Sequence, residues 1–301
     1  KPAPDEQEVL VKVESAGINF IDTYQRSGLY QIPLPATLGL EAAGTVVETS
    51  AAVTGLQSGD RVAYTNVAGA YAEYAAVPAD KLVPIPDGVS FDQGAAAMLQ
   101  GCTAHYLCMS TYKVQAGDRC LIHAAAGGVG LLLIQMVKML GGTVIGTVST
   151  EAKAELARQA GADEVILYSE QDFQAEVERI TEGQGVNVAY DSVGKATFEK
   201  SIDCLSRFGT VVLYGNASGP VTEFNPATLG PKGSLFLTRP TLFDYLASRE
   251  DLEWRSSDVF NWISEGKLDL RLEYFYPLAE ARAAHEALEA RMTTGKVILK
   301  P

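Results

Sequence analysis

The chain has 301 residues, enough for two domains with separate cores, and its 47% hydrophobic and 20% charged residues are typical of a globular protein. A formal net charge of −13 argues against a general affinity for nucleic acid or for anionic membranes. The longest apolar run is too short and too interrupted to span a bilayer, and the four cysteines form no CxxC pair. We therefore expect no membrane span, cysteines that pack as small core residues, and a reducing, cytoplasmic location.

The first hundred residues contain short β-like runs separated by Gly and Pro. These runs lie at residues 8–13, 43–48, 59–63, 71–77 and 81–85. Because they lack the strand and helix alternation of a parallel sheet, we predict an antiparallel, barrel-like domain.

From residue 91 the pattern becomes helical, and beyond residue 112 short apolar strands alternate with helices. The expected strands lie at residues 119–122, 143–147, 164–166, 186–191, 209–214 and 234–237. The expected helices lie at residues 95–99, 103–112, 131–140, 151–159, 173–181 and 198–205. Six strands joined by helical crossovers predict a doubly wound parallel sheet.

The last part of the chain is predicted to hold helices at 258–265 and 279–291 and strands at 274–276 and 296–299. The final strand resembles those of the first region, so we expect it to return to the N-terminal domain. The predicted fold class is therefore α/β, with a Rossmann doubly wound parallel sheet inserted into a barrel-like, β-rich domain. We place the β-rich domain at 1–101 plus 270–301 and the Rossmann domain at 102–269.

A glycine-rich turn follows the first strand of the predicted parallel sheet and opens a helix. The spacing of Ala125, Gly127 and Gly130 is the dinucleotide fingerprint with its first glycine replaced by alanine. Glycines there let the backbone approach a pyrophosphate, whose charge lies on the helix N-terminus. The alternative is a turn that needs glycine for packing only, but the strand and helix on either side favour nucleotide binding.

The end of the second strand indicates which nucleotide is bound. An acidic residue there would accept hydrogen bonds from the ribose hydroxyls and would repel a 2′-phosphate. No Asp or Glu occurs before Glu151, whereas Ser149 and Lys153 offer a hydroxyl and a positive charge, so we predict NADPH. The alternative is that Ser149 or Thr150 caps the next helix and Lys153 is a solvated surface residue.

Several motifs resemble the zinc-independent quinone oxidoreductases of the medium-chain dehydrogenase/reductase superfamily, the group that includes ζ-crystallin. They lie at residues 16–24, 26–30, 38–44, 123–130, 190–194 and 214–219, with further likeness at 238–240 and 284–286. The likeness covers essentially the whole chain, and the first motif, with its paired tyrosines, is similar to the bacterial branch. Members of this family begin further upstream, so we expect a truncated chain in which one sheet edge of the N-terminal domain lacks a partner.

The resemblance implies roles for individual residues along the cofactor. Asn19 and Thr103 would lie near the nicotinamide, and Tyr168 would join Ser149 and Lys153 at the adenosine end, although Tyr168 could instead cover the sheet edge. The implied pyrophosphate-binding residues are Ala126, Gly127, Gly128, Val129 and Gly130. The residues implied to follow along the cofactor or to close over it are Ser192, Tyr214, Asn216, Ser218, Phe236, Thr238 and Arg291.

The resemblance also bears on zinc. In the zinc-dependent alcohol dehydrogenases of the same superfamily, a Cys stands in place of Asn19 and a His in place of Leu40. Tetrahedral zinc needs Cys or His ligands in most positions, so we predict no metal. Glu41, the remaining carboxylate of that motif, is expected to have a structural role.

The predicted chemistry is hydride transfer, which is the cofactor's own reaction, so the protein has to orient the reactants and exclude water. The catalytic candidates are Tyr24 and Tyr30, whose phenols can donate to a developing quinol oxyanion, with Asn19 near the nicotinamide. Asp22 or Arg26 would orient the tyrosines. The alternative is that both tyrosines pack in a loop with one solvated end.

The three histidines are not predicted to be catalytic. We expect His123 to form structural hydrogen bonds with the backbone, and His105 and His285 to lie on helix surfaces or at an interface.

The sequence therefore predicts an NADPH-dependent quinone reductase whose active site lies between the two domains. An enoyl or alkenal reductase on the same scaffold is the first alternative, and a non-catalytic NADPH-binding or RNA-binding protein is the second. The family also implies a homodimer joined through the apolar edge strand at 234–237. The physiological acceptor, the proton donor and the number of electrons transferred at once stay open.

Overall fold

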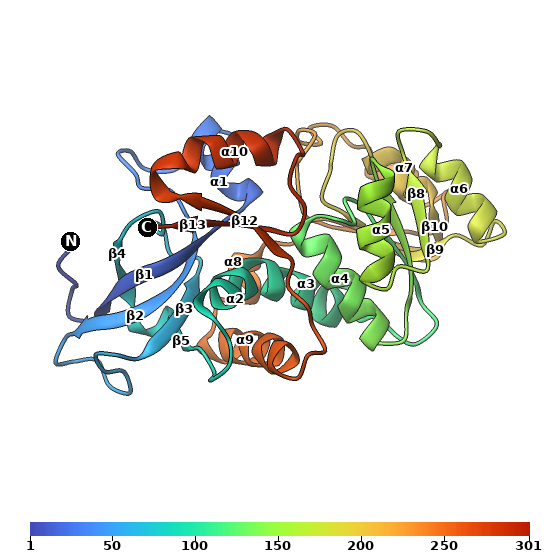
Figure 1. Ribbon diagram of the computed structural model, residues 1–301. Coiled ribbons are helices and arrows are strands. Elements are labelled where there is room, and N and C mark those ends of the chain that lie inside the picture. The colour runs from blue at the N-terminus through green and yellow to red at the C-terminus, as the bar shows by residue number, and fades with distance from the viewer. The chain divides into compact units, whose positions relative to one another are not determined.

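The computed structural model describes residues 1–301 and divides into two compact units. The first unit contains Lys1–Cys102 and Leu242–Pro301, and the second contains Thr103–Thr241 (Figure 1). The sequence instead placed residues 242–269 with the second unit. They belong with the first because α9 (Arg249–Ser264) packs against residues 79–81 and 97–101 of that unit.

The first unit is built on a seven-stranded sheet, and the antiparallel, β-rich prediction is confirmed for the first hundred residues, whereas the two C-terminal strands of the unit pair in parallel. The strands are β1 (Glu8–Ile18), β2 (Glu41–Thr49), β3 (Arg61–Thr65), β4 (Tyr74–Pro78), β5 (Val83–Pro84), β12 (Leu272–Pro277) and β13 (Lys296–Lys300). The central strand β1 pairs antiparallel with β2, β4 and β13. Alternate residues of β1, among them Val9, Val11 and Val13, lie in the buried core, as the period of two in a strand requires. The C-terminal strand therefore returns to the N-terminal domain as predicted.

Short helices surround this sheet. They are α1 (Phe20–Ser27), α2 (Phe91–Ala96), α8 (Leu242–Tyr245), α9 and α10 (Ala281–Glu289), with α3 (Cys102–Tyr106) at the passage into the second unit. Two π-helical turns, Ala97–Gly101 and Leu107–Thr111, lie on either side of α3. The sequence did not predict α1, and it started α9 nine residues too late, at residue 258.

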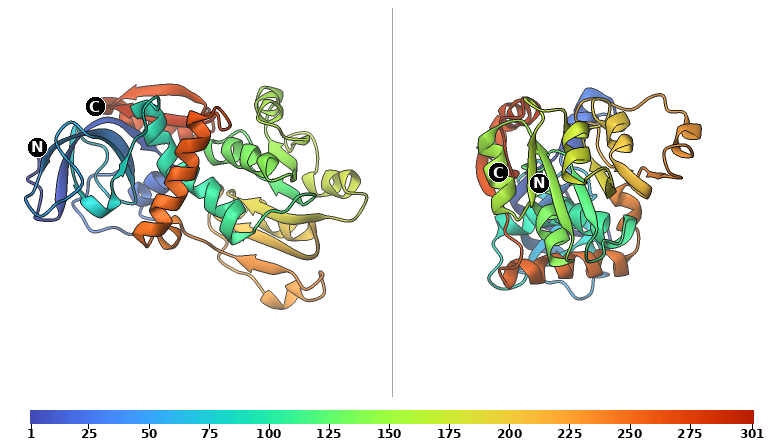
Figure 2. Two further views of the ribbon diagram at one scale, coloured as in Figure 1. Left: turned by 90° about the horizontal axis from the view of Figure 1, so that it is seen from below. Right: turned by 90° about the vertical axis from the view of Figure 1, so that its right-hand side faces the viewer.

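The second unit is a six-stranded parallel sheet in the order β11-β10-β9-β6-β7-β8, which confirms the Rossmann prediction. Its strands are β6 (Arg119–Ile122), β7 (Thr143–Val148), β8 (Glu164–Leu167), β9 (Val186–Asp191), β10 (Leu205–Leu213) and β11 (Phe236–Thr238). Its helices are α4 (Gly128–Met139), α5 (Glu151–Gln159), α6 (Phe173–Ile180) and α7 (Phe198–Asp203). Helix α4 packs beside α5 and α6 beside α7, and Figure 2 shows the two pairs on opposite faces of the sheet.

The burial of the cysteines and the character of the helices can be compared with what the composition predicts. All four cysteines are free thiols and buried, so their prediction as core residues is confirmed. None of the helices combines the length and the apolar character that a transmembrane span requires.

Candidate functional site

The turn between β6 and α4 has the geometry of a pyrophosphate cradle. The backbone N–H of Gly127 donates to the carbonyl of Ala124 at 2.8 Å, and Ala124 adopts a positive φ of 50°. A Cβ at position 130 would lie 2.8 Å from the carbonyl oxygen of Ala125 and still closer to that of Ala124. Only glycine therefore fits at position 130. Helix α4 begins at Gly128 with no side-chain cap, so its first N–H groups remain available to an anion.

The alanine at the first fingerprint position is accommodated by the neighbouring strand. A Cβ on Gly146 of β7 would lie 2.9 Å from the Cβ of Ala125, which is fully buried. The missing side chain at position 146 thus leaves the space that Ala125 occupies. The departure of this turn from the glycine pattern therefore leaves its backbone geometry intact.

The predicted adenosine end follows β7 in the second unit. The hydroxyl of Thr150 caps α5 by accepting from the backbone N–H of Lys153 at 3.4 Å, so the cap is Thr150 and not Ser149. Ser149 and Lys153 are half-buried, and 41% of Tyr168 is exposed beyond the end of β8. Glu151, the first acid after β7, is ion-paired with Arg158 at 2.5 Å. The roles of Ser149, Lys153 and Tyr168 stay predictions.

The turns after β9 and β10 are joined by hydrogen bonds at the carboxyl edge of the sheet. The hydroxyl of Ser218 donates to the carbonyl of Val193 at 2.8 Å and accepts from the backbone N–H of Ala196 at 2.9 Å. Asp191 accepts from the backbone N–H groups of Val193 and Gly194. Ser218 thus holds the two turns together. The other predicted residues of these turns, Ser192, Tyr214 and Asn216, are half-buried or buried beside them.

Behind these turns lies a buried network centred on His123. Its ring contacts the hydroxyl of Thr147 at 2.8 Å and that of Ser201 at 2.9 Å, and Ser201 donates to Asp191 at 2.8 Å. Burial lowers the pKa of His123, which keeps the ring neutral, although the nearby Asp191 carboxylate opposes this shift. The prediction of a structural role agrees with this network, but the partners are side chains and not the backbone. The network connects the ends of β6, β7 and β9 through α7.

In the first unit, Asn19 lies between β1 and α1 within a buried polar cluster. Its side-chain nitrogen donates to Glu41 Oε1 at 2.6 Å, and its oxygen accepts from Lys296 at 2.9 Å and from Gln100 at 3.2 Å. Lys296 and Glu41 form an ion pair in which the side chains are 2% and 0% exposed. Glu41 therefore has the structural role expected of it. The sequence did not single out Lys296, because it lies 255 residues from Glu41 and follows no motif.

Asp22 lies on the buried face of α1, and its hydrogen bonds differ from those expected. Its carboxylate accepts from the backbone N–H of Asn19 at 2.7 Å and from the hydroxyl of Tyr71 at 3.0 Å. Arg26 forms an ion pair with Glu289 at 2.7 Å and contacts the ring of His285 at 3.1 Å. These contacts fix α1, the helix that carries Tyr24, to the rest of the first unit. The expectation that Asp22 or Arg26 orients the tyrosines stays a prediction.

Tyr24 and Tyr30 contact each other. Their ring centroids lie 5.3 Å apart at an interplanar angle of 67°, an edge-to-face arrangement, and the backbone N–H of Tyr30 donates to the carbonyl of Tyr24 at 3.1 Å. Tyr24 lies on α1 and not in a loop, and both residues are half-buried. The structure therefore brings together the two phenols that the sequence proposed as donors.

His105 and His285 were expected on a helix surface or at an interface; the surface position is wrong, and the interface position stays a prediction. His105 and His285 are 0% and 2% exposed. His285 is buried because its ring contacts both Tyr71, at 3.0 Å, and Arg26. These partners are distant in sequence, so helix periodicity could not reveal them.

The remaining predicted residues fall in both units. Thr103 is buried at the start of the second unit, Phe236 and Thr238 lie on β11, and Arg291 follows α10 in the first unit. Arg291 adopts a positive φ of 59°, just beyond the helix in which the sequence placed it. The cofactor contacts of these four residues stay predictions.

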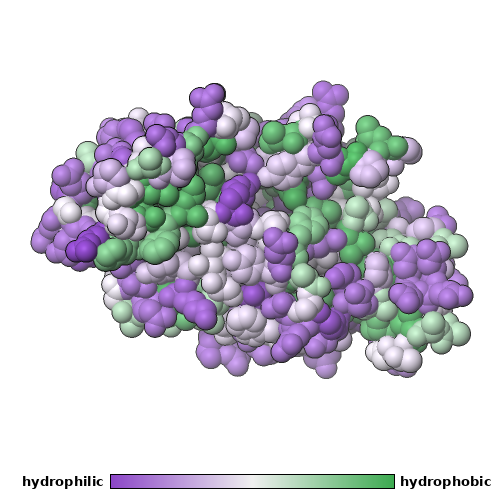
Figure 3. Space-filling model, turned by 180° about the vertical axis from the view of Figure 1, so that it is seen from behind, coloured by the Kyte–Doolittle hydropathy of each residue, from purple (hydrophilic) through white to green (hydrophobic).

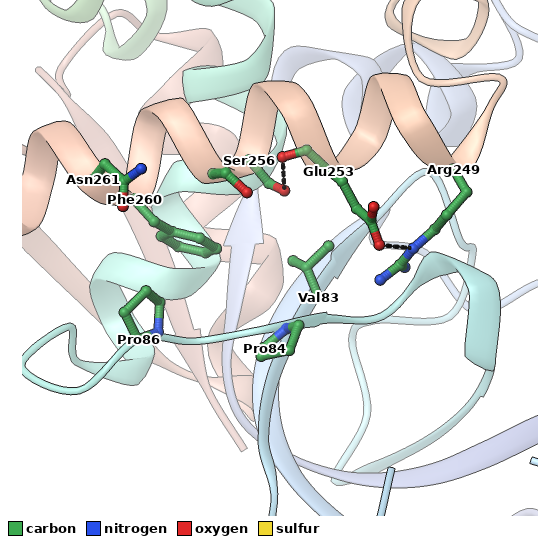
Figure 4. A pocket seen from close by; sticks show the side chains of 9 residues that line it. Val83, Pro84, Pro86, Arg249, Glu253, Ser256, Phe260 and Asn261 are labelled. Carbon is green, nitrogen blue, oxygen red and sulfur yellow. Dashed lines mark hydrogen bonds and ion pairs between the residues drawn. The ribbon is translucent and has the colours of Figure 1, made fainter. Parts of the chain in front are cut away.

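A pocket of about 330 Å³ lies elsewhere in the first unit, between α9 and β5. Figure 4 shows Phe260 projecting from α9 toward the segment that carries Pro84 and Pro86, while Arg249 and Glu253 pair on the same helix. None of the predicted site residues lines this pocket, so we do not assign it to the reaction. No group of three or more His, Cys, Asp or Glu side chains is arranged to hold a metal ion.

The ionisation of Asp22 predicts how stability varies with pH. Burial raises the pKa of Asp22 from 3.8 to about 7, although hydrogen bonds from Asn19 and Tyr71 oppose this shift. Between these values the native carboxyl keeps a proton that the unfolded chain loses, so this contribution to stability is present at low pH and is lost as pH rises to about 7. Asp22→Asn cannot ionise. We expect its unfolding free energy, relative to the parent protein, to rise by about 1–3 kcal/mol between pH 5 and pH 8 in urea titrations. A difference that does not change with pH would contradict this assignment.

Known proteins and protein families resemble this chain in both of its units. A family model described as zinc-binding dehydrogenase matches residues 128–256, and one described as alcohol dehydrogenase GroES-like domain matches residues 5–87. A quinone oxidoreductase of Pseudomonas aeruginosa is 48% identical over 300 residues, which cover 99% of this chain and 92% of the relative. A 2-haloacrylate reductase of a Burkholderia species is 42% identical over 308 residues, with the same two coverages.

The structural comparison gives the same result. The crystal structure of Escherichia coli quinone oxidoreductase complexed with NADPH matches with a TM-score of 0.98 at 46% sequence identity. The match covers 100% of this chain and 94% of that chain. The folds of the two proteins therefore agree across both units.

Proposed function

Because the chain belongs to the quinone oxidoreductases of the medium-chain dehydrogenase/reductase superfamily, we propose that it reduces a quinone with hydride from NADPH and without zinc. The observation that carries the proposal is the turn at residues 124–130. It combines a glycine that cannot bear a side chain with a helix N-terminus that no side chain caps. That turn suits the pyrophosphate of a dinucleotide.

The residues around the turn fit NADPH. Gly127, Gly128 and Gly130 would hold the pyrophosphate, and Ser149 and Lys153 would hold the 2′-phosphate. No Asp or Glu lies between β7 and Glu151, and Glu151 itself is ion-paired with Arg158. Thr103, Tyr168, Ser192, Tyr214, Asn216, Ser218, Phe236, Thr238 and Arg291 are proposed to contact the rest of the cofactor. When bound, NADPH supplies hydride from its nicotinamide ring.

The protein's own contribution is to orient the reactants and to donate hydrogen bonds. Asn19 is held by charged partners, so its amide is fixed before a ligand arrives. The phenols of Tyr24 and Tyr30 are proposed to donate to the oxygen of the acceptor as negative charge develops on it. A phenol O–H is a hydrogen-bond donor and can act in this way.

A second candidate function has a specific observation in its favour. The Burkholderia relative, at 42% identity, is a 2-haloacrylate reductase, so the same scaffold is associated with a second unsaturated acceptor. Reduction of an activated double bond also places negative charge on a carbonyl oxygen, which the same donors would stabilise. The two activities therefore differ in the shape of the acceptor and not in the groups proposed here.

The decisive experiment follows NADPH consumption with naphthoquinones, benzoquinones, 2-alkenals and 2-haloacrylates in parallel. Turnover of the quinones supports the first proposal, and turnover of only the unsaturated carbonyl compounds supports the second. Tight binding of NADPH with no turnover of any acceptor would contradict both and would favour a non-catalytic protein.

The choice of NADPH over NADH predicts the effect of removing Lys153. Lys153→Ala is expected to raise the Kd for NADPH by about tenfold, through loss of a charge-assisted contact with the 2′-phosphate, and to leave the Kd for NADH nearly unchanged. Fluorescence titration of the reduced nicotinamide measures both constants. Lys113→Ala is the control for net charge, because Lys113 is exposed and precedes β6, at the opposite edge of the sheet from the carboxyl ends of the strands. Equal weakening of NADPH and NADH would refute the assignment.

The proposed assembly is a cytoplasmic homodimer. Strand β11 pairs only with β10 and lies at the edge of the parallel sheet. Its Phe236 and Leu237 are 60% and 37% exposed, and Figure 3 shows that hydrophobic areas of the surface alternate with hydrophilic ones. An exposed apolar edge strand favours pairing with a second copy. The net charge of −13 weighs against nucleic acid as a partner.

A further inference from the structure

We propose that the buried Lys296–Glu41 ion pair is a positioning device that fixes the side-chain amide of Asn19 with an N–H group, and not its oxygen, directed at the ligand. The inference rests on the proposed function, in which Asn19 lies near the nicotinamide. It assigns to Lys296, a residue outside every recognised motif, a role in the reaction through Asn19.

The hydrogen bonds of Asn19 leave one group unused. An amide oxygen has two acceptor positions and an amide nitrogen has two N–H donors. The oxygen of Asn19 accepts from Lys296 at 2.9 Å and from Gln100 at 3.2 Å, so both of its positions are filled. The nitrogen donates once, to Glu41 at 2.6 Å. The remaining capacity of the side chain is therefore a single N–H donor.

The charges of the ion pair select this orientation. A rotation of the amide by 180° would place its N–H groups against the Lys296 ammonium and its oxygen against the Glu41 carboxylate. Both contacts would be repulsive in a site from which water is excluded, where Coulomb interactions are strong. The ion pair therefore fixes which end of the Asn19 amide faces Lys296 and which faces Glu41. A neutral pair of the same size would not distinguish the two orientations.

The ion pair itself is fixed from several sides. The second carboxylate oxygen of Glu41 accepts from the backbone N–H of Leu99 at 2.6 Å, in the π-helical turn Ala97–Gly101. On β1, a Cβ at Gly17 would lie 2.6 Å from the Lys296 ammonium. Because Gly17 has no side chain, the Lys296–Glu41 pair can pack directly against β1. Segments from β1, β2, β13 and the π-helical turn together determine how the amide is directed.

The consequence concerns which ligand atoms can be recognised at this point. A fixed N–H donor binds a carbonyl, hydroxyl or oxyanion oxygen, and it would leave a ligand N–H group unpaired. In the proposed complex this means an oxygen of the nicotinamide carboxamide or of its ribose, and not the carboxamide N–H groups.

The kinetic test removes both charges while keeping the shape of the site. Lys296→Met combined with Glu41→Gln leaves a neutral pair that accepts either orientation of Asn19. We expect kcat/KM with NADPH and a quinone to fall about tenfold or more, as for loss of an oriented donor. The matched control is Lys300→Met combined with Asp92→Asn, which neutralises a second ion pair of the same strand β13. The control should keep kcat/KM within about twofold.

A cycle with Asn19→Ala separates positioning from a general structural effect. If the ion pair acts through Asn19, its neutralisation should cost nothing further in an Asn19→Ala background. If it acts on the fold as a whole, the two losses should multiply, and that result would overturn the proposal. Retention of full kcat/KM by the neutral-pair variant would overturn it as well.

A readout without turnover keeps this proposal separate from the proposed function. In the ligand-free parent protein, the side-chain amide of Asn19 should give one pair of proton NMR signals, with one proton shifted downfield by the carboxylate. In the neutral-pair variant we expect a second set of signals or an averaged one. An unchanged single set in that variant would refute the positioning role. Absence of turnover in the parent protein, with the expected amide signals, would refute only the quinone reductase.

Discussion

Lys296→Met alone is expected to lower the free energy of unfolding by about 3–5 kcal/mol, because it leaves the Glu41 carboxylate buried without its countercharge. Glu41 is fully buried, so water cannot replace the ammonium without opening the structure. Removing both charges, with Glu41→Gln added, should recover most of the loss, since neither remaining group is ionised. Urea titration of the parent protein and the two variants at one pH measures these differences.

An exposed ion pair provides the comparison for this experiment. Arg282 and Glu286 pair on α10 with side chains that are 90% and 59% exposed. Arg282→Ala should leave stability almost unchanged, because water solvates the charge that remains. If Lys296→Met cost as little as Arg282→Ala, the buried pair would contribute nothing to the fold.

Gly130→Ala has the second largest expected effect and acts on the cofactor. The added Cβ would meet the carbonyl oxygens of Ala124 and Ala125, which are backbone atoms and cannot rotate away as a side chain would. The turn has to open, so the N–H groups of α4 move from where the pyrophosphate is proposed to bind. We expect the Kd for NADPH to rise about a hundredfold and the free energy of unfolding to fall by about 1–3 kcal/mol.

Gly230→Ala is the matched control, in the same unit and with the same added atom. A Cβ there would have no neighbour nearer than 3.8 Å, and φ at Gly230 is −61°, which any residue adopts. Its Kd for NADPH and its stability should stay close to those of the parent protein. Normal NADPH binding by Gly130→Ala would exclude the turn as the pyrophosphate site.

Much of the second unit could be predicted from sequence because its signals are local. The buried parallel strands contain short apolar runs, as at Arg119–Ile122, and the helices after β6, β7 and β8 each end near a glycine. The one irregular position of the fingerprint, Ala125, was visible in the sequence. The absence of a side chain at Gly146 that makes room for it was not, because it depends on the pairing of two strands.

The first unit was harder to predict because its inward-facing side chains include polar ones. Helix α1 has only eight residues, and its buried ones are the polar Asp22 and Thr23, so no apolar run marks it in the sequence. Helix α9 was started too late for a related reason. Its buried face includes Arg255, whose guanidinium donates to the carbonyl of Tyr245 at 3.0 Å and stacks on Trp254.

In the candidate site too, residues within one short motif could be predicted, whereas partners from distant segments could not. Asn19, Tyr24 and Tyr30 were found because they lie in one short motif. The partners that orient Asn19 were missed, because Lys296 and Gln100 reach it from segments that only the complete fold brings together.

The pairing of β1 with β13 has a consequence for how the protein is made. Ala16 lies opposite Leu299, so the central strand of the first unit gains one of its neighbours only after the whole second unit has been synthesised. The second unit is a continuous segment, Thr103–Thr241, and can complete its sheet while synthesis continues. Until then the part of β1 that pairs with β13, residues 16–18, presents an open edge, so the first unit is expected to complete its sheet after the second.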